Sequence, residues 1–99
     1  MDAKEALALA HSYAIIVRQD YPNADIYLFG SRAAGTNNAE SDIDIAVVVE
    51  KIEGDWLENS SRLWRLRQNI SSYIEPILLN ANHDASGFVQ HIRKTGKKL

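Results

Sequence analysis

A run of β-branched residues from Ile43 to Val49 sets the architecture of this 99-residue chain. The sequence of this run is IDIAVVV, and every residue after Asp44 is apolar. Because neighbouring side chains of a strand point to opposite faces, a strand here is expected to be buried on both faces. Each face of this strand must then be covered by other parts of the chain. A chain of this length is expected to form one domain, residues 1–99, with a small hydrophobic core.

The other elements follow from caps, helix breakers and apolar spacing. Three helices are expected: one over residues 2–20, one that begins after a cap at Asp55, and one that begins after a cap at Ser86 and ends at Gly96. Two further strands are expected over residues 25–29 and 73–79. Residues 31–41 are expected to form a loop with one helical turn. The order α-β-loop-β-α-β-α predicts an α/β (α+β) fold, in which helices flank a small three-stranded sheet. The sequence alone leaves the pairing directions open, and we expect a mixed sheet.

Two aspartates, Asp42 and Asp44, stand at the start of the central strand. Because strand side chains alternate in direction, both carboxylates point to the same face. Carboxylates held side by side repel each other unless a cation lies between them, and Mg²⁺ prefers such hard oxygen ligands. The plainer interpretation is a strand end that happens to be acidic.

The preceding strand ends at Gly30-Ser31, and ten residues separate Ser31 from Asp42. A glycine there lets backbone amides approach a phosphate closely, and the serine offers a hydroxyl and an amide at the start of a helical turn. The intervening loop is long enough to bring this segment opposite the aspartates. An ordinary turn is the alternative interpretation.

A third acid, Glu75, lies in the last expected strand between apolar residues. An acid in that setting is costly to bury without a partner. Glu75 could complete a three-carboxylate site that holds two metal ions. Alternatively, it points to solvent from an edge strand, an interpretation that the neighbouring Pro76 supports.

Together these segments resemble a known family. FGSRAAGT over residues 29–36 and SDIDIAV over residues 41–47 are similar to the signature of the DNA polymerase beta superfamily of nucleotidyltransferases, and within it to the minimal nucleotidyltransferase (MNT) group. The resemblance covers nearly the whole chain and implies the nucleotidyltransferase fold. It implies that two Mg²⁺ ions are held by the catalytic acids Asp42, Asp44 and Glu75. It assigns the nucleotide to Gly30, Ser31, Arg32 and Ser41.

The resemblance also implies an activity, the transfer of a nucleoside monophosphate, AMP from ATP, to an acceptor hydroxyl. MNT proteins often pair with small helical HEPN proteins in toxin–antitoxin systems. The implied acceptor is therefore a tyrosine of a HEPN toxin, with this chain as the antitoxin. One alternative is a catalytically weak or inactive scaffold that binds nucleotide and neutralises its partner by binding. Another is a stand-alone transferase for small hydroxylated molecules.

The composition of the chain argues against several other classes of protein. A formal net charge of −2 lacks the basic excess typical of proteins that grip a nucleic-acid backbone, so direct nucleic-acid binding is not expected. The absence of cysteine excludes a disulfide scaffold and a thiolate metal site. No segment reaches bilayer-spanning length and the start does not resemble a secretory signal, so a cytoplasmic protein is expected. Because the core is small, assembly into a homo-oligomer stays open.

Overall fold

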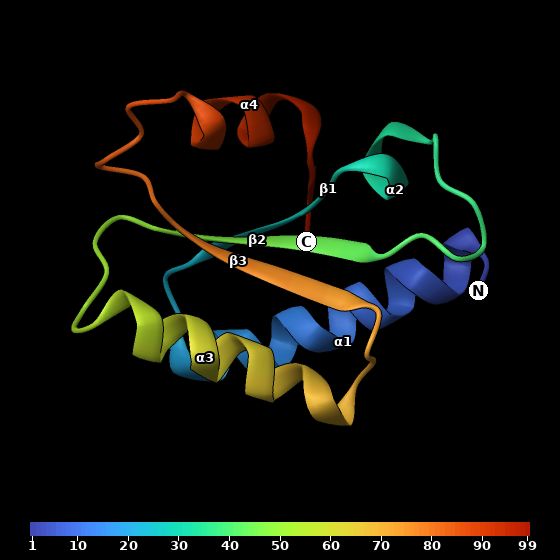
Figure 1. The fold of residues 1–99 in the computed structure, drawn as a ribbon, viewed down its shortest axis with the longest axis horizontal. Helices are drawn as coiled ribbons and strands as arrows, with labels where there is room; N and C mark the ends of the chain where they lie inside the picture. The colour runs from blue at the N-terminus through green and yellow to red at the C-terminus, as the bar shows by residue number, and fades with distance from the viewer.

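A mixed four-stranded sheet in the order β3-β2-β1-β4 lies between two layers of helices (Figure 1). The structure, a computed structural model, describes all residues from 1 to 99. Its helices are α1 (Ala3–Asp20), α2 (Ser31–Ala34), α3 (Trp56–Leu66), the 3-10 turn η1 (Arg67–Asn69) and α4 (Phe88–Thr95). Its strands are β1 (Asp25–Phe29), β2 (Ile43–Val49), β3 (Ile74–Asn80) and β4 (Lys97–Lys98).

The pairing directions confirm the expected mixed sheet. β1 runs antiparallel to both β2 and β4, whereas β2 runs parallel to β3. The expectation of three strands is wrong by one, because Lys97 and Lys98 pair with Leu28 and Tyr27 to form β4. Two exposed lysines carry no local strand signal, so this strand exists only through its pairing with β1.

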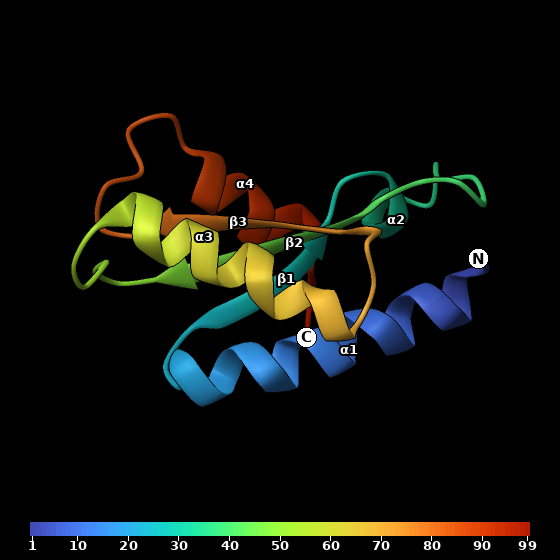
Figure 2. The ribbon, with the colours of Figure 1, turned by 60° about the horizontal axis from the view of Figure 1, so that its bottom comes forward.

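The sheet is covered on both faces, as the apolar run of β2 predicts. On one face α1 and α3 pack on Ile43, Ile45 and Val47, which belong to the larger core cluster (Figure 2). On the other face the α4 residues Val89 and Ile92 belong to a smaller cluster with the alternate side chains of β1 and β2. None of the helices combines the length and the apolar character that crossing a membrane requires.

The two helices on the larger core are joined by buried polar contacts as well as by apolar packing. The hydroxyl of Tyr13 in α1 donates to the backbone carbonyl of Leu63 in α3 at 2.7 Å. The hydroxyl of Tyr21 donates to Oδ1 of Asn59 at 2.5 Å. These bonds satisfy polar groups that would otherwise be buried without a partner.

The start of the last helix differs from expectation. Gly87, with φ +76°, is the residue before the helix, and Ser86 Oγ accepts only from Phe88 N at 3.3 Å. The carboxylate of Asp84 caps the first turn, accepting from Val89 N at 2.8 Å and from Gln90 N at 3.1 Å. The left-handed turn at Gly87 brings this carboxylate to the free amides, and a charged acceptor binds them more strongly than a hydroxyl.

The open edge of β3 is protected by side chains from α3 and η1. Trp56 Nε1 donates to the carbonyl of Leu78 at 3.4 Å, and Arg67 Nη1 donates to the carbonyl of Ile74 at 3.2 Å. Between them Pro76 has no backbone N–H to offer. The edge therefore presents few free groups for pairing with another strand.

Candidate active site

The sheet register brings three separate segments of the chain to one place. In the parallel ladder Asp44 is paired with Glu75, and in the antiparallel ladder it is paired with Phe29, the residue before Gly30. The register follows from burial, because Ile43 must face the larger core and its neighbour Asp44 therefore faces the opposite side.

The carboxylates lie on the face of the sheet that carries α4, but beyond the part that α4 covers. In Figure 1, α4 lies over one end of the sheet and the short helix α2 lies over the other, near the start of β2. Asp42 and Glu75 are exposed and Asp44 is partly buried. The acids thus form an open surface that a large molecule can approach.

Gly30 lies directly against this surface. It has a φ of +74°, and a Cβ atom at this position would overlap Oδ2 of Asp44 and lie 3.3 Å from its Cγ. Ser31 begins α2 at the next position, where the first amides of a helix lack intrahelical partners. Position 30 therefore requires a glycine, because its backbone lies too close to the carboxylate of Asp44 to leave space for a side chain.

Two of the three acids, Asp44 and Glu75, have raised pKa values. Burial, followed by the negative charge of Asp42, raises the pKa of Asp44. Loss of solvent contact also raises the pKa of Glu75, with further contributions from the charges of Asp42 and Asp44 and a hydrogen bond to Asp42. The positive charge of Arg67 opposes that rise in the pKa of Glu75. A cation at this site would relieve the repulsion that these pKa shifts record.

The donor chemistry fits Mg²⁺, but the side chains do not form a finished ligand cage. No group of three or more Asp, Glu, His or Cys side chains is positioned to hold a metal ion. Asp42 is close enough to raise the pKa of Asp44, and both aspartates are close enough to raise the pKa of Glu75, but the three carboxylates do not converge on a common point. A divalent cation bound between these carboxylates would offset their mutual repulsion and draw their oxygens toward one point.

Arg32 and Ser41 meet in the loop that leads into Asp42. Arg32 Nε donates to the carbonyl of Ser41 at 3.1 Å, and Nη2 donates to the carbonyl of Asn38 at 3.4 Å. Ser41 Oγ accepts from the amide of Asn38 at 3.0 Å, which closes the turn. The guanidinium thus holds the loop, and its buried Nη1 is left without a hydrogen-bond partner.

Arg67 is the residue near the acids that the sequence did not single out. It follows α3, where it is one of three arginines in a segment whose pattern fits either a solvated helix surface or a contact for phosphate or an acidic partner. The chain turn after η1 brings it back to the start of β3, where its charge acts on Glu75. No local sequence signal distinguishes it from its neighbours Arg62 and Arg65.

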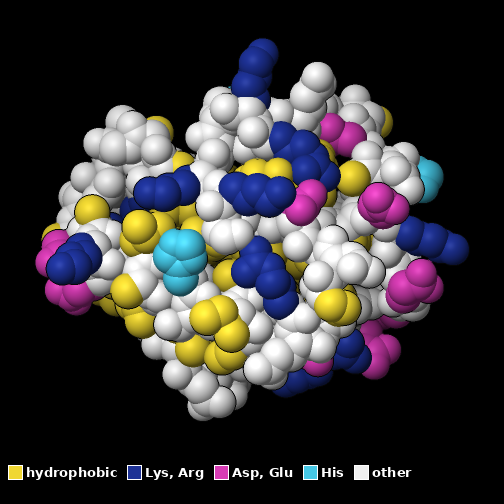
Figure 3. Space-filling view, turned by 180° about the vertical axis from the view of Figure 1, so that it is seen from behind, with side chains coloured by type: hydrophobic (Ala, Val, Ile, Leu, Met, Phe, Trp, Pro, Cys, Tyr) yellow, Lys and Arg dark blue, Asp and Glu magenta, His cyan; other side chains and the backbone are white.

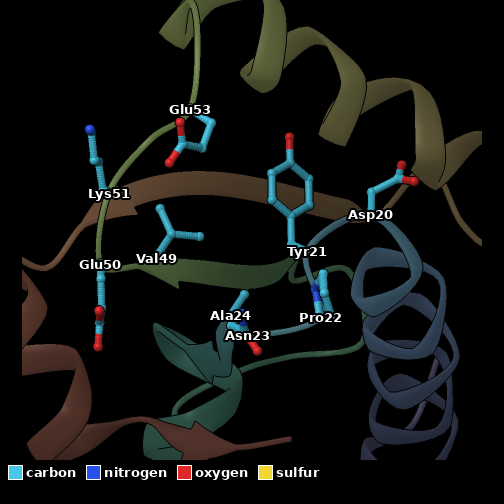
Figure 4. A pocket seen from close by; sticks show the side chains of 9 residues that line it. All are labelled: Asp20, Tyr21, Pro22, Asn23, Ala24, Val49, Glu50, Lys51 and Glu53. Carbon is cyan, nitrogen blue, oxygen red and sulfur yellow. The ribbon is translucent and has the colours of Figure 1, made fainter.

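A hollow in the molecule lies away from the acids. It has a volume of about 500 Å³ and is lined by the turn between α1 and β1 and by the segment that follows β2 (Figure 4). Tyr21, Glu50 and Lys51 are among its lining residues. Because β2 starts at the acids and ends at this hollow, the two sites occupy opposite ends of the sheet.

Comparisons with known proteins agree with this geometry. A family profile described as "Polymerase beta, Nucleotidyltransferase" matches residues 14–99. The protein adenylyltransferase MntA of Shewanella oneidensis is 34% identical over an alignment of 87 residues, with 85% of this chain and 59% of MntA covered. The chain therefore spans less than two thirds of the length of that relative.

Two solved structures resemble the fold. One, from Sulfolobus solfataricus and provisionally described as a nucleotidyltransferase, has a TM-score of 0.67 and 27% identity over 98% of this chain and 83% of its own. The other comes from a mutant of the toxin–antitoxin pair MntA–HpeT, with a TM-score of 0.63 and 26% identity over 90% of this chain and 69% of its own. This chain belongs to the polymerase beta nucleotidyltransferase family, within which it is similar to the minimal nucleotidyltransferases.

Proposed function

We propose that this chain is a magnesium-dependent nucleotidyltransferase that moves AMP from ATP to a hydroxyl of a partner protein. The observation that carries the proposal is the register that sets Asp44 between Glu75 and the Gly30 backbone. Phosphoryl transfer depends on positioning and on charge stabilisation, and this arrangement places acids beside a glycine-containing turn.

Each residue has a proposed role. Gly30 and Ser31 hold the triphosphate with the first amides of α2 and the serine hydroxyl, while Arg32 and Ser41 hold the loop beside it. The residues that would hold two Mg²⁺ ions are Asp42, Asp44 and Glu75. Two such ions, when bound, neutralise phosphate charge and stabilise the attacking and leaving oxygens.

The transfer exchanges one bond for another. The acceptor oxygen forms a bond to the α-phosphorus of ATP, the bond from that phosphorus to the bridging oxygen breaks, and pyrophosphate leaves. The proton of the acceptor hydroxyl passes to Glu75, the exposed acid of the third strand. Glu75 is paired with Asp44 in the parallel ladder, which sets its carboxylate beside the proposed metal ligands and within the site where the acceptor must arrive.

The proposed acceptor is a tyrosine on a HEPN-type toxin, which makes this chain the antitoxin. MntA, to which the chain is similar, is a protein adenylyltransferase, and the MntA–HpeT structure is that of a toxin–antitoxin pair. An open carboxylate surface suits an acceptor that arrives on a folded protein, because a small molecule usually needs a pocket to bury it.

Intact-mass analysis tests the proposal. The purified protein is incubated with Mg²⁺, ATP and the protein encoded next to it, and the neighbour is weighed. We expect the mass of the neighbour to rise by one or more AMP units, and Asp42→Asn and Asp44→Asn to abolish the rise. Asp20→Asn, an exposed acid at the distant hollow, is the matched control and keeps full transfer. A tight complex without transfer from any nucleotide would favour the scaffold that neutralises its partner by binding.

A further inference from the structure

The exposed apolar surface of this protein is concentrated on one helix. Four large hydrophobic side chains are exposed, and three belong to α3: Trp56 at 51%, Leu57 at 64% and Trp64 at 40%. The fourth, Ile15, lies on α1. On the face shown in Figure 3, hydrophobic side chains appear in small separate groups among Lys, Arg and polar residues. An apolar group of this kind on a small protein indicates an interaction surface.

Two of these side chains, Leu57 and Trp64, form a stripe along the outer side of α3, whereas Trp56 flanks it on the side of Leu63. Leu57 and Trp64 are seven residues apart, which is two helical turns, so they lie on the same side. Ser61 stands between them and leaves room for close approach by another helix, while the hydroxyl of the adjacent Ser60 is already buried within the chain. The buried residue Leu63 points the other way, into the core.

Trp64 of the stripe and the flanking Trp56 are already ordered. Trp56 is held by its hydrogen bond from Nε1 to the carbonyl of Leu78, at 3.4 Å. The guanidinium of Arg67 lies 4.6 Å from the ring centroid of Trp64. Aromatic side chains that are fixed before binding lose little conformational freedom on binding, which favours their use as contacts.

The charges beside the stripe have a particular arrangement. Glu58 lies near its start and Arg65 near its end, on the same flank, and both are exposed. Neither takes part in an ion pair within the chain, since the two ion pairs of the structure both involve Asp25. If an identical helix packs alongside in the antiparallel direction, the same flanks of the two helices meet. The acid of each helix then lies beside the base of the other.

We propose that the α3 stripe binds a second copy of this chain, with the two α3 helices antiparallel about a two-fold axis near Ser61. Leu57 of each copy then packs on Trp64 of the other, and Glu58 of each faces Arg65 of the other. A parallel pair would instead set this flank against the opposite flank of the second helix, where the two charges find no such match.

The extent of the surface sets the expected strength. A helix of 11 residues is roughly 16 Å long at about 1.5 Å per residue, so the contact is smaller than a standard protein interface. We therefore expect a weak dimer that forms in the micromolar range. Because α3 and the three acids lie on opposite faces of the sheet, the dimer leaves both candidate active sites open. Association can therefore be measured separately from the proposed activity.

Sedimentation equilibrium over micromolar to millimolar concentrations, combined with charge exchange, tests the inference. Glu58→Arg and Arg65→Glu should each weaken the dimer about tenfold or more, since each places like charges across the interface. Mixing the two variants should restore dimers, because opposite charges then face each other at both ends of the shared flank. The double variant should dimerise for the same reason. Thermal melting by circular dichroism checks that every variant is folded.

Three outcomes would overturn the inference. The first is a wild-type protein that stays monomeric at millimolar concentration. The second is a dimer that neither Glu58→Arg nor Arg65→Glu weakens, which would place the interface elsewhere. The third is a mixture of the two folded variants that associates no better than either variant alone, because compensation between copies is what the antiparallel arrangement requires.

Discussion

Gly30 packs its backbone directly against the carboxylate of Asp44, so that any side chain at position 30 would overlap Asp44 Oδ2. The glycine also has a φ of +74°, in a region that side chains disfavour. The residue after β1, Gly30, and the second residue of β2, Asp44, are therefore in direct contact where the proposed nucleotide-binding loop begins.

Gly30→Ala should displace Asp44 and abolish nucleotidyl transfer, with a loss of stability of about 1–3 kcal/mol from backbone strain. Gly87→Ala is the matched control, because Gly87 has a similar φ of +76° but nothing within 4 Å of an added Cβ. The control should lose about 1 kcal/mol and keep full transfer. Urea denaturation and the transfer assay measure the two effects, and equal transfer by both variants would refute the expectation.

Asp44→Asn should raise the melting temperature at neutral pH in the presence of EDTA. Burial and the charge of Asp42 raise the pKa of Asp44 in the folded state, so the unfolded state ionises first as pH rises. The wild type therefore has its full stability below the ordinary pKa of an aspartate and loses some as pH climbs through the raised value. The advantage of the variant should shrink as pH falls, and added Mg²⁺ should stabilise only the wild type.

Asp25→Asn provides a control of opposite sign. Hydrogen bonding from Arg93, followed by contributions from Lys98, lowers the pKa of Asp25 in the folded state. This group contributes stability above the ordinary pKa of an aspartate, and the contribution is lost as pH falls through the lowered value. Asp25→Asn should therefore lower the melting temperature at neutral pH. A gain in stability from both substitutions would contradict the assignment of repulsion to the Asp44 site.

Arg32→Ala should loosen the loop that carries Asp42. The variant loses the two donors that bind the carbonyls of Ser41 and Asn38, which are partly or fully exposed, so we expect a loss of stability of only about 1 kcal/mol. Amide exchange at Ser41 should accelerate without nucleotide, and affinity for Mg²⁺-ATP should fall roughly tenfold.

Arg32→Lys keeps one donor and should give an intermediate result, while Lys94→Ala, an exposed base on α4, should change neither quantity. Calorimetric titration and hydrogen exchange followed by NMR measure both. A weaker affinity for Mg²⁺-ATP with an unchanged rate of amide hydrogen exchange at Ser41 would show that Arg32 acts on the phosphates and not on the loop.

Tyr13→Phe should cost about 1–3 kcal/mol, because it leaves the carbonyl of Leu63 buried without its donor. Tyr73→Phe is the control, since the hydroxyl of Tyr73 makes only an exposed contact of 3.5 Å to Glu40. Its effect should stay within about 0.5 kcal/mol. Denaturant titration measures both, and equal losses would mean that the bond between α1 and α3 contributes little.

Sequence patterns were sufficient where structure is local. β1 and β2 occupy the expected residues 25–29 and 43–49, because each is an apolar run with a clear boundary. The caps of α1 and α3 at Asp2 and Asp55 accept amide hydrogen bonds at 2.8 and 3.1 Å. These features depend on neighbours a few residues away, which a sequence displays directly.

Features that depend on distant partners escaped the sequence. β4 forms only because Lys97 and Lys98 meet the free edge of β1, and the cap of α4 is Asp84 because Gly87 turns the chain. The pleat alone puts Asp42 and Asp44 on one face, but the position of Glu75 beside Asp44 needed the parallel register, which the sequence left open.

A crystal structure of the protein with Mn²⁺ and a non-hydrolysable ATP analogue tests the proposed site most directly. We predict anomalous density for metal between Asp42 and Asp44, with Glu75 drawn toward it and the triphosphate on the amides after Gly30. Gly30→Ala crystals under the same conditions should lack both. Nucleotide bound in the hollow beside Tyr21, with no metal at the three acids, would contradict the assignment of this surface as a nucleotidyltransferase site.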